Sequence, residues 1–282
     1  MMAQKTFSKP YFHFNPNDQK SADFAALLSR DLGDFGIEDA DVIINVGGDG
    51  TVIRSFHLLP QLPNFAVKSP SSNSKLFNGH AGIDNATDLK RAFESAQPHV
   101  IRPLKGEVGM SDGTTIDIHA YQDIVARSFT SEAVISDNYI DGIPLHRVMG
   151  TGCMVSTPMG ASALNETNGG KVIGMESGQL VFTLSGVSDT HERERLSSND
   201  KISVIFDNES RFYSELSTQA DRRETAIVFD SYSLLPDGQP YTPGERAIID
   251  TSLRSVQTLG VEMDFDPARE RILMLNPQFR TP

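Results

Sequence analysis

The sequence contains very little cysteine, with Cys153 as the one example among 282 residues. A single cysteine excludes both an intramolecular disulfide and a zinc site built from cysteines. Histidine offers no substitute, because the seven histidines stand singly, without a helical pair at the spacing of metal ligands. We therefore expect no metal site formed by the side chains alone. The lack of disulfides is typical of a cytoplasmic protein.

Positive charge is also scarce. The chain has 25 Lys and Arg residues against 37 Asp and Glu residues, which gives a net charge of −12 at pH 7. Such a balance repels duplex nucleic acid and anionic membranes. Long apolar runs are missing as well, both at membrane-spanning length and as a signal peptide after the first ten residues. We expect a soluble cytoplasmic protein with neither nucleic acid nor membrane as a partner.

The first third of the chain alternates between strand-like and helix-like apolar spacing. Expected strands cover residues 11–14, 42–46 and 62–67. The first expected helix runs from Ser21, its cap, to near Gly33 or Gly36, and two more cover residues 51–59 and 85–96. Strands that alternate with helices indicate a parallel sheet with crossover helices. We therefore predict a Rossmann-like α/β domain over residues 1–99, one of the two domains that the length favours.

After about residue 100 the pattern changes to short alternating segments separated by turns such as Asp112-Gly113 and Asp141-Gly142. Expected strands cover residues 100–104, 115–119, 124–129, 133–135, 201–206 and 226–229. This pattern predicts an antiparallel β-sandwich domain over residues 100–249. We expect the tail of about 250–282, with an extended run at 271–275, to return to the first domain.

The most distinctive stretch is Gly47-Gly48-Asp49-Gly50-Thr51, which joins the apolar strand 42–46 to the next helix. Glycines let another molecule approach the backbone, and the N–H groups at a helix start favour a phosphate. A carboxylate beside that phosphate repels it unless a divalent cation or a substrate hydroxyl intervenes. Asp49 is thus predicted to hold magnesium or to take a proton from an attacking hydroxyl. The alternative is that Asp49 only caps a helix that begins at Thr51.

A second motif interrupts the β-rich part. It runs from Gly150-Thr151-Gly152 through Ser156-Thr157-Pro158-Met159-Gly160-Ala161-Ser162-Ala163 to Gly169-Gly170, and it reads as a turn that feeds a short helix. Together the two motifs resemble those of the NAD kinase family, enzymes that phosphorylate NAD to NADP. The first motif is shared with the related diacylglycerol and sphingosine kinases, whereas those lipid kinases lack the second in this form. The resemblance spans roughly residues 39–232.

The resemblance implies the roles of individual residues. Asp49 corresponds to the catalytic aspartate, and Gln122-Asp123 fall where the family has an Asn-Glu pair that holds base and ribose. The implied substrate and nucleotide contacts are Gly47, Gly48, Gly50, Thr51, Phe77, Gln122, Asp123, Thr151, Met159, Ser162, Ala163, Leu164 and Asp230.

Four of these contacts keep an alternative reading. Phe77 either stacks on a base or anchors its loop, and Gln122-Asp123 either bind the nucleoside or simply lead into the next strand. Asp230 either faces the phosphate donor or is a turn residue.

Besides Gln122-Asp123 and the loop at residues 69–78, three positions depart from the family pattern. Thr151 replaces an aspartate, Leu164 replaces a tyrosine, and Ser162 replaces a threonine. These changes remove one carboxylate, one aromatic face and one phenol from the implied pocket. The resemblance therefore implies a nucleotide site with altered substrate contacts.

The implied reaction transfers the terminal phosphoryl group of ATP, or of polyphosphate, to the 2′-hydroxyl of the adenosine ribose of NAD. Mg²⁺ or another divalent cation accompanies ATP, and a homo-oligomer, dimer or tetramer, is implied by likeness. No Walker-type lysine motif locates the donor site. Two alternatives remain: a lipid kinase of the same group, and a dinucleotide-binding protein that has lost catalysis.

Overall fold

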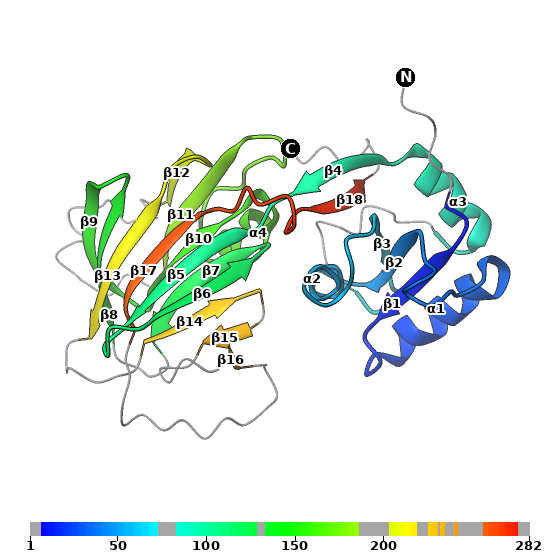
Figure 1. The fold of residues 1–282 in the computed structure, drawn as a ribbon, viewed down its shortest axis with the longest axis horizontal. Coiled ribbons are helices and arrows are strands. Elements are labelled where there is room, and N and C mark those ends of the chain that lie inside the picture. Colours follow the sequence, from blue (N-terminus) through cyan, green and yellow to red (C-terminus); the bar gives the residue numbers. More distant parts are fainter. Residues whose placement is uncertain are drawn as a thin grey trace. The chain divides into compact units, whose positions relative to one another are not determined.

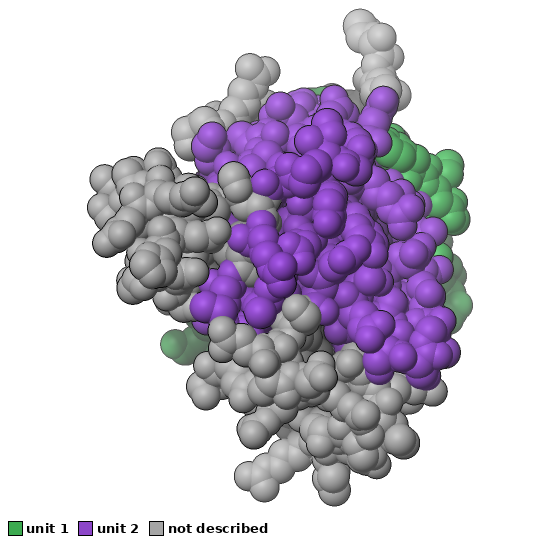
Figure 2. Space-filling model, turned by 90° about the vertical axis from the view of Figure 1, so that its left-hand side faces the viewer, with its two compact units in different colours: residues 1–102, 265–282 green, residues 103–264 purple. Residues whose placement is uncertain are grey.

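A computed structural model of the chain describes residues 7–72, 83–128, 133–185, 203–218, 225–230, 232–234, 240–241 and 256–275. The chain forms two compact units, residues 1–102 with 265–282 and residues 103–264 (Figure 2). The first is an α/β unit and the second is built from antiparallel sheets. The fold class predicted from the sequence is thus confirmed.

The first unit contains a five-stranded sheet of order β1-β2-β3-β18-β4 (Figure 1). Strands β1, β2, β3 and β18 run parallel, and β4 is antiparallel to β18. The elements of this unit are β1 (Pro10–Phe14), α1 (Gln19–Leu32), β2 (Val42–Gly47), α2 (Asp49–Leu58), β3 (Asn64–Lys68), α3 (Ala86–Ser95), β4 (Gln97–Ile101) and β18 (Arg271–Leu275).

The side chains on one buried face of β2 are apolar, whereas the other face contributes Asn45 to a polar network. Alternate residues, with Ile44 at the centre, pack in an apolar cluster with α1 and α3. On the other face the Asn45 amide donates to Asn64 Oδ1 at 2.9 Å, and Ser55 of α2 donates to the same oxygen at 2.8 Å. Since Asn45, Asn64 and Ser55 are each 1% exposed, these bonds satisfy groups that burial would otherwise penalise. The network fixes α2 against the sheet and so positions its first turn.

The start of α1 corrects one prediction. The helix begins at Gln19 and its cap is Asp18, not Ser21. The Asp18 carboxylate accepts from the Ser21 N–H at 3.4 Å and from the Ser21 hydroxyl at 2.6 Å, so the serine expected as the cap is the donor.

The second unit contains two antiparallel sheets, of order β12-β11-β10-β7-β14-β15-β16 and β6-β5-β17-β13-β8-β9. Its strands are β5 (Leu104–Met110), β6 (Thr115–Ala120), β7 (Asp123–Ser128), β8 (Val134–Ile140), β9 (Ile143–Gly150), β10 (Gly152–Ser156), β11 (Gln179–Ser185), β12 (Ser203–Asp207), β13 (Phe212–Thr218), β14 (Thr225–Phe229), β15 (Tyr232–Leu234), β16 (Pro240–Tyr241) and β17 (Val256–Met263). Two short helical segments follow β10, α4 (Pro158–Gly160) and the π-helical turn η1 (Ala161–Asn165).

One face of the seven-stranded sheet lies in the main apolar core. Ile124 of β7 and Val155 of β10 belong to that core, together with residues of both sheets. Because successive side chains of a strand point to opposite faces, Asp123 and Ser156 lie on the other face. There Ala161 of η1 packs against Val181 of β11, so the helical segment covers this second face.

The strand expected at residues 100–104 does not exist as one element. Strand β4 ends at Ile101 in the sheet of the first unit, and β5 begins at Leu104 in the second unit. Pro103 lies between them and has no backbone N–H to continue a ladder. Strand β17 pairs with β5 and β13 and so belongs to the second unit. After it, from Phe265, the chain returns to the first unit.

Candidate functional site

The glycine-rich turn places Asp49 in the first turn of α2. Gly48 is the N-cap, at φ −108° and ψ −175°, without a side-chain capping bond. The expectation of a helix that begins at Thr51 with Asp49 as its cap is therefore wrong, since the helix starts two residues earlier. In the first turn a carboxylate interacts favourably with the helix dipole. Asp49 is half-buried there, at the carboxyl end of β2.

None of the glycines of this turn has a left-handed φ. A Cβ on Gly47 would lie 3.0 Å from Thr51 Cβ, so this glycine makes room for the threonine. A Cβ on Gly50 would meet no described atom within 4 Å. Among the described residues nothing therefore fills the space at Gly50, at a helix start where N–H groups and the dipole favour an anion.

A second cluster forms in the other unit, where β7 begins and β10 and β14 end. Asp123 pairs with Ser156 across β7 and β10, and Ile124 pairs with Phe229 across β7 and β14. Asp230 follows Phe229 directly. Antiparallel pairing thus brings together two residues that the sequence had separated, Asp123 and Asp230.

The carboxylate of Asp230 binds the backbone that leads into β7. It accepts from the N–H of Tyr121, from Gln122 N–H at 2.6 Å and from Asp123 N–H at 3.4 Å. Asp230 is 3% exposed and has a φ of 44°. A non-glycine residue in this left-handed region is uncommon, and the hydrogen bonds of the carboxylate help to hold it there.

Asp123 has an altered protonation equilibrium. Burial, and then the neighbouring negative charge of Asp230, raise the pKa of Asp123 to about 7. Both causes disfavour the carboxylate. Near neutral pH this side chain therefore exists in both forms, and the protonated form can donate as well as accept a hydrogen bond.

Thr157 binds the same segment from the other side. Its hydroxyl donates to the carbonyl oxygens of Tyr121 at 2.7 Å and of Gln122 at 3.1 Å, and its N–H donates to Gln122 O at 2.9 Å. As the N-cap of α4, Thr157 also accepts from Gly160 N–H at 3.3 Å. A Cβ on Gly160 would lie 2.7 Å from the Gln122 carbonyl carbon, so only glycine fits at this position.

Four predicted contacts of the second motif lie on α4 and η1. Met159 is buried, Ser162 and Ala163 are half-buried, and Leu164 is 42% exposed. Ala163 leaves helical geometry, with φ −106° and ψ −115°. The hydroxyls of Ser162 and Ser156 are buried without a hydrogen-bond partner among the described residues. Buried hydroxyls normally have partners, so these two oxygens mark places where water or a ligand group would bind.

Asn165 and Thr183 are residues of this region that the sequence analysis missed. Asn165 Nδ2 donates to the carbonyl oxygens of Ala161 and Lys171, each at 2.9 Å, and Thr183 donates to Asn165 Oδ1 at 2.6 Å. These bonds fasten η1 to β11. The Gly169-Gly170 pair was the available signal, since a Cβ on Gly170 would lie 2.4 Å or less from the Asn165 side chain, which leaves no room for one.

The remaining predicted residues are not brought into either cluster. Thr151 is an exposed residue between β9 and β10. Phe77 lies outside the described residues. Asp49 belongs to the first unit, whereas Gln122, Asp123 and the residues of α4 and η1 belong to the second.

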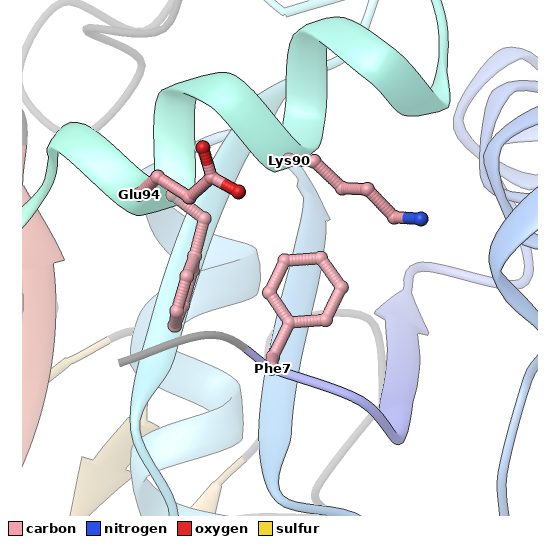
Figure 3. A pocket seen from close by; sticks show the side chains of 4 residues that line it. Phe7, Lys90 and Glu94 are labelled. Carbon is pink, nitrogen blue, oxygen red and sulfur yellow. The ribbon is translucent and has the colours of Figure 1, made fainter. Parts of the chain in front are cut away.

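A pocket of about 240 Å³ lies in the first unit between the start of the described chain and α3. Figure 3 shows Phe7 below the helix that carries Lys90 and Glu94. Phe7 packs edge-on against Phe93 at 4.7 Å between ring centroids. None of the predicted site residues lines this pocket.

No protein-family model matches the chain. Individual proteins do match. An NAD kinase of Xanthomonas campestris pv. campestris is 29% identical over 175 residues, which cover 61% of this chain and 66% of that protein. An NAD kinase of Xylella fastidiosa is 28% identical over 160 residues, 56% of this chain and 59% of that protein.

Over 61% and 56% of its length the chain is thus similar in sequence to NAD kinases. The matched part spans just under two thirds of the Xanthomonas protein. Two solved structures share the fold. Yeast NADH kinase complexed with NADH has a TM-score of 0.65 at 15% identity and covers 98% of this chain and 85% of that one. NAD kinase from Archaeoglobus fulgidus in complex with ATP has a TM-score of 0.61 at 16% identity, over 96% and 94%.

These relatives do not favour the lipid-kinase alternative, since each is named an NAD or NADH kinase.

Among the described residues no group of three or more His, Cys, Asp or Glu side chains could hold a metal ion. A magnesium ion in such an enzyme needs only one or two carboxylates when substrate phosphates supply the other ligands. The single carboxylate of Asp49 at an open helix start fits that arrangement. No described helix is long and apolar enough to cross a membrane.

Proposed function

We propose that the protein is an NAD kinase that transfers a phosphoryl group from ATP, or from polyphosphate, to the 2′-hydroxyl of the adenosine ribose of NAD. The observation that supports this most strongly is the position of Asp49. Its carboxylate stands in the first turn of α2, next to Gly50, where a Cβ would meet no described atom within 4 Å. A general base for a hydroxyl and a site for the donor phosphate thereby lie side by side.

In the proposed reaction Asp49 accepts the proton of the 2′-hydroxyl. The ribose oxygen forms a bond to the terminal phosphorus, the bond from that phosphorus to the bridging oxygen breaks, and ADP leaves when ATP is the donor. The N–H groups at the start of α2 hold the donor phosphates. Mg²⁺ or another divalent cation, which enters with ATP, neutralises phosphate charge when bound. The protein therefore contributes mainly position and electrostatics.

Gln122 and Asp123 would hold the acceptor nucleoside. The Gln122 amide can donate to and accept from a base, and the Asp123 carboxyl can bind ribose hydroxyls. Met159, Ser162 and Ala163 would complete this side, with the Ser162 hydroxyl, which has no hydrogen-bond partner among the described residues, as a hydrogen-bonding group. Thr151 and Leu164 would add a hydroxyl and an aliphatic surface.

The direct test is an assay of the purified full chain with NAD, ATP and Mg²⁺, in which NADP is measured with an NADP-specific dehydrogenase. NADP formation supports the proposal. Phosphorylation of diacylglycerol in place of NAD would favour the lipid-kinase alternative. Thermal stabilisation by NAD without turnover would indicate a dinucleotide-binding protein that has lost catalysis.

We further propose a cytoplasmic homo-oligomer, dimer or tetramer, with NAD and ATP as its small-molecule partners. This assembly is what the resemblance of the two motifs to the NAD kinase family implies. Light scattering coupled to size-exclusion chromatography measures the mass of the particle directly. A mass near the 30.9 kDa of one chain would contradict the oligomer.

A further inference from the structure

The three residues that lead into β7 have their backbone held from two sides. The N–H groups of Tyr121, Gln122 and Asp123 all donate to the Asp230 carboxylate. The carbonyl oxygens of Tyr121 and Gln122 both accept from the Thr157 hydroxyl. We call this arrangement, Asp230 and Thr157 around residues 121–123, the backbone clamp.

The clamp is built from buried groups. Asp230 is 3% exposed and Thr157 is 2% exposed. A buried carboxylate needs several donors to offset the loss of water, and three consecutive N–H groups supply them. The two arms come from distant parts of the chain, because Asp230 follows β14 and Thr157 follows β10. Both strands flank β7 in the sheet, so the clamp closes over the strand between them.

The clamped segment carries the two side chains that the proposed function assigns to the acceptor nucleoside. If the backbone at residues 121–123 shifts, Gln122 and Asp123 move with it, and a bound nucleotide loses both contacts at once. Asp230 itself directs its carboxylate at the backbone. The family resemblance implies another role at this strand end, an aspartate that faces the phosphate donor.

We propose that Asp230 is a positioning residue for the acceptor nucleotide, which acts by clamping the backbone of residues 121–123 so that Gln122 and Asp123 point at the nucleoside. This inference rests on the proposed function. It makes a prediction that separates it from the donor-facing role. Loss of the Asp230 carboxylate raises KM for NAD and leaves KM for ATP unchanged, whereas a donor-facing residue would show the opposite pattern.

The test uses Asp230→Gly in the full chain. Glycine adopts the φ of 44° at this position without strain, so the substitution removes the carboxylate and preserves the backbone conformation. The matched control is Asp141→Gly, because Asp141 also has a left-handed φ, of 50°, and also accepts a backbone hydrogen bond, from Arg211 N–H at 2.8 Å. Asp141 lies in the turn between β8 and β9, outside the clamp.

Two readouts are measured on each variant. The first is steady-state kinetics, where Asp230→Gly should raise KM for NAD by on the order of tenfold or more, since charged hydrogen bonds are lost. The second is amide hydrogen exchange of residues 121–123, which should speed up by at least a similar factor. Asp141→Gly should change neither. Asp230→Asn, which keeps one acceptor oxygen, should give an intermediate effect and serves as the test if Asp230→Gly does not fold.

Unchanged exchange at residues 121–123 would overturn the clamp. Faster exchange together with a raised KM for ATP and an unchanged KM for NAD would overturn the positioning role. If the wild-type chain forms no NADP, the proposed function fails by itself. The exchange experiment, with the affinity for NAD from calorimetry in place of KM, then still decides whether Asp230 positions the segment.

Discussion

The N–H of Gln122 donates to Asp230 Oδ1 at 2.6 Å, although 108 positions separate the two residues in the chain. The same carboxylate raises the pKa of Asp123, in addition to the effect of burial. One acidic side chain thus both fixes the backbone of the proposed nucleoside site and changes the protonation of its neighbour. The predictions on Asp123 below depend on this relationship.

Asp123→Asn should stabilise the protein at pH 8 and not at pH 4. The pKa of Asp123 is about 7 in the fold against 3.8 as the ordinary value. The folded state therefore keeps a proton that the unfolded state loses between these values, and its stability falls as pH rises through that window. The full loss above pH 7 is on the order of 4 kcal/mol. Chemical denaturation across pH 4 to 8 measures the change, and equal effects of the substitution at both ends would contradict it.

KM for NAD should depend on pH with an inflection near 7, because the Asp123 carboxylate accepts from a ribose hydroxyl more strongly than the neutral acid does. KM is expected to fall as pH rises through that value. Asp230→Asn removes the nearby negative charge, so the inflection should move to lower pH, and Asp123→Asn should abolish it. Kinetics from pH 5.5 to 8.5 at saturating ATP test this. If the inflection in KM for NAD stays at the same pH in both variants, it arises from the titration of a group other than Asp123, and the prediction is contradicted.

Gly160→Ala should destabilise the second unit. The added Cβ would lie 2.7 Å from the Gln122 carbonyl carbon, and backbone cannot move aside as a flexible side chain can. Overpacking of this kind costs about 1–3 kcal/mol. The control is Gly174→Ala, where a Cβ meets no described atom within 4 Å and the change should stay within about 0.5 kcal/mol. Urea denaturation of the two variants provides the comparison, and equal stabilities would contradict the close approach.

Gly50→Ala should weaken the binding of ATP without lowering the stability of the protein. A Cβ at this position meets no described atom within 4 Å, and alanine favours a helix over glycine by about 0.5–1 kcal/mol. The melting temperature should therefore hold or rise. KM for ATP should increase by roughly tenfold if phosphate approaches the helix start here, since a methyl group blocks that approach. An unchanged KM for ATP in this variant would show that the donor phosphates bind elsewhere.

Much of the fold was predictable because burial imposes periodicity. The apolar run 42–46 and the short alternating segments after residue 100 indicated the parallel and the antiparallel sheets. The boundaries of helices and strands were harder to predict where a single residue determined them. Pro103 splits the expected strand at 100–104, and Asp18 starts α1 before the expected cap, Ser21. Pro103 lacks the N–H that would continue the strand, and Asp18 supplies the carboxylate that caps the helix.

The glycine-rich motifs were visible in the sequence, whereas contacts that depend on strand pairing were not. Gly160 and Gly170 belong to the second motif, and the structure shows the close contacts that require a glycine at each of them. The position of Asp230 against residues 121–123 depends on the register of β7 and β14, which a single sequence does not specify. The network of Asn45, Asn64 and Ser55 beneath α2 was missed, because isolated polar residues in apolar segments look like interruptions until their partners are known.

The most direct test of the account compares NADP formation by the wild-type chain and by Asp49→Asn, with Asp31→Asn on the exposed side of α1 as the control for the same chemical change. The account predicts that wild type and Asp31→Asn form NADP from NAD and ATP. Asp49→Asn should lose at least 10²-fold in kcat, the lower range for a general base, while its circular dichroism and melting temperature stay close to wild type. Wild-type turnover that persists undiminished in Asp49→Asn would contradict the central claim.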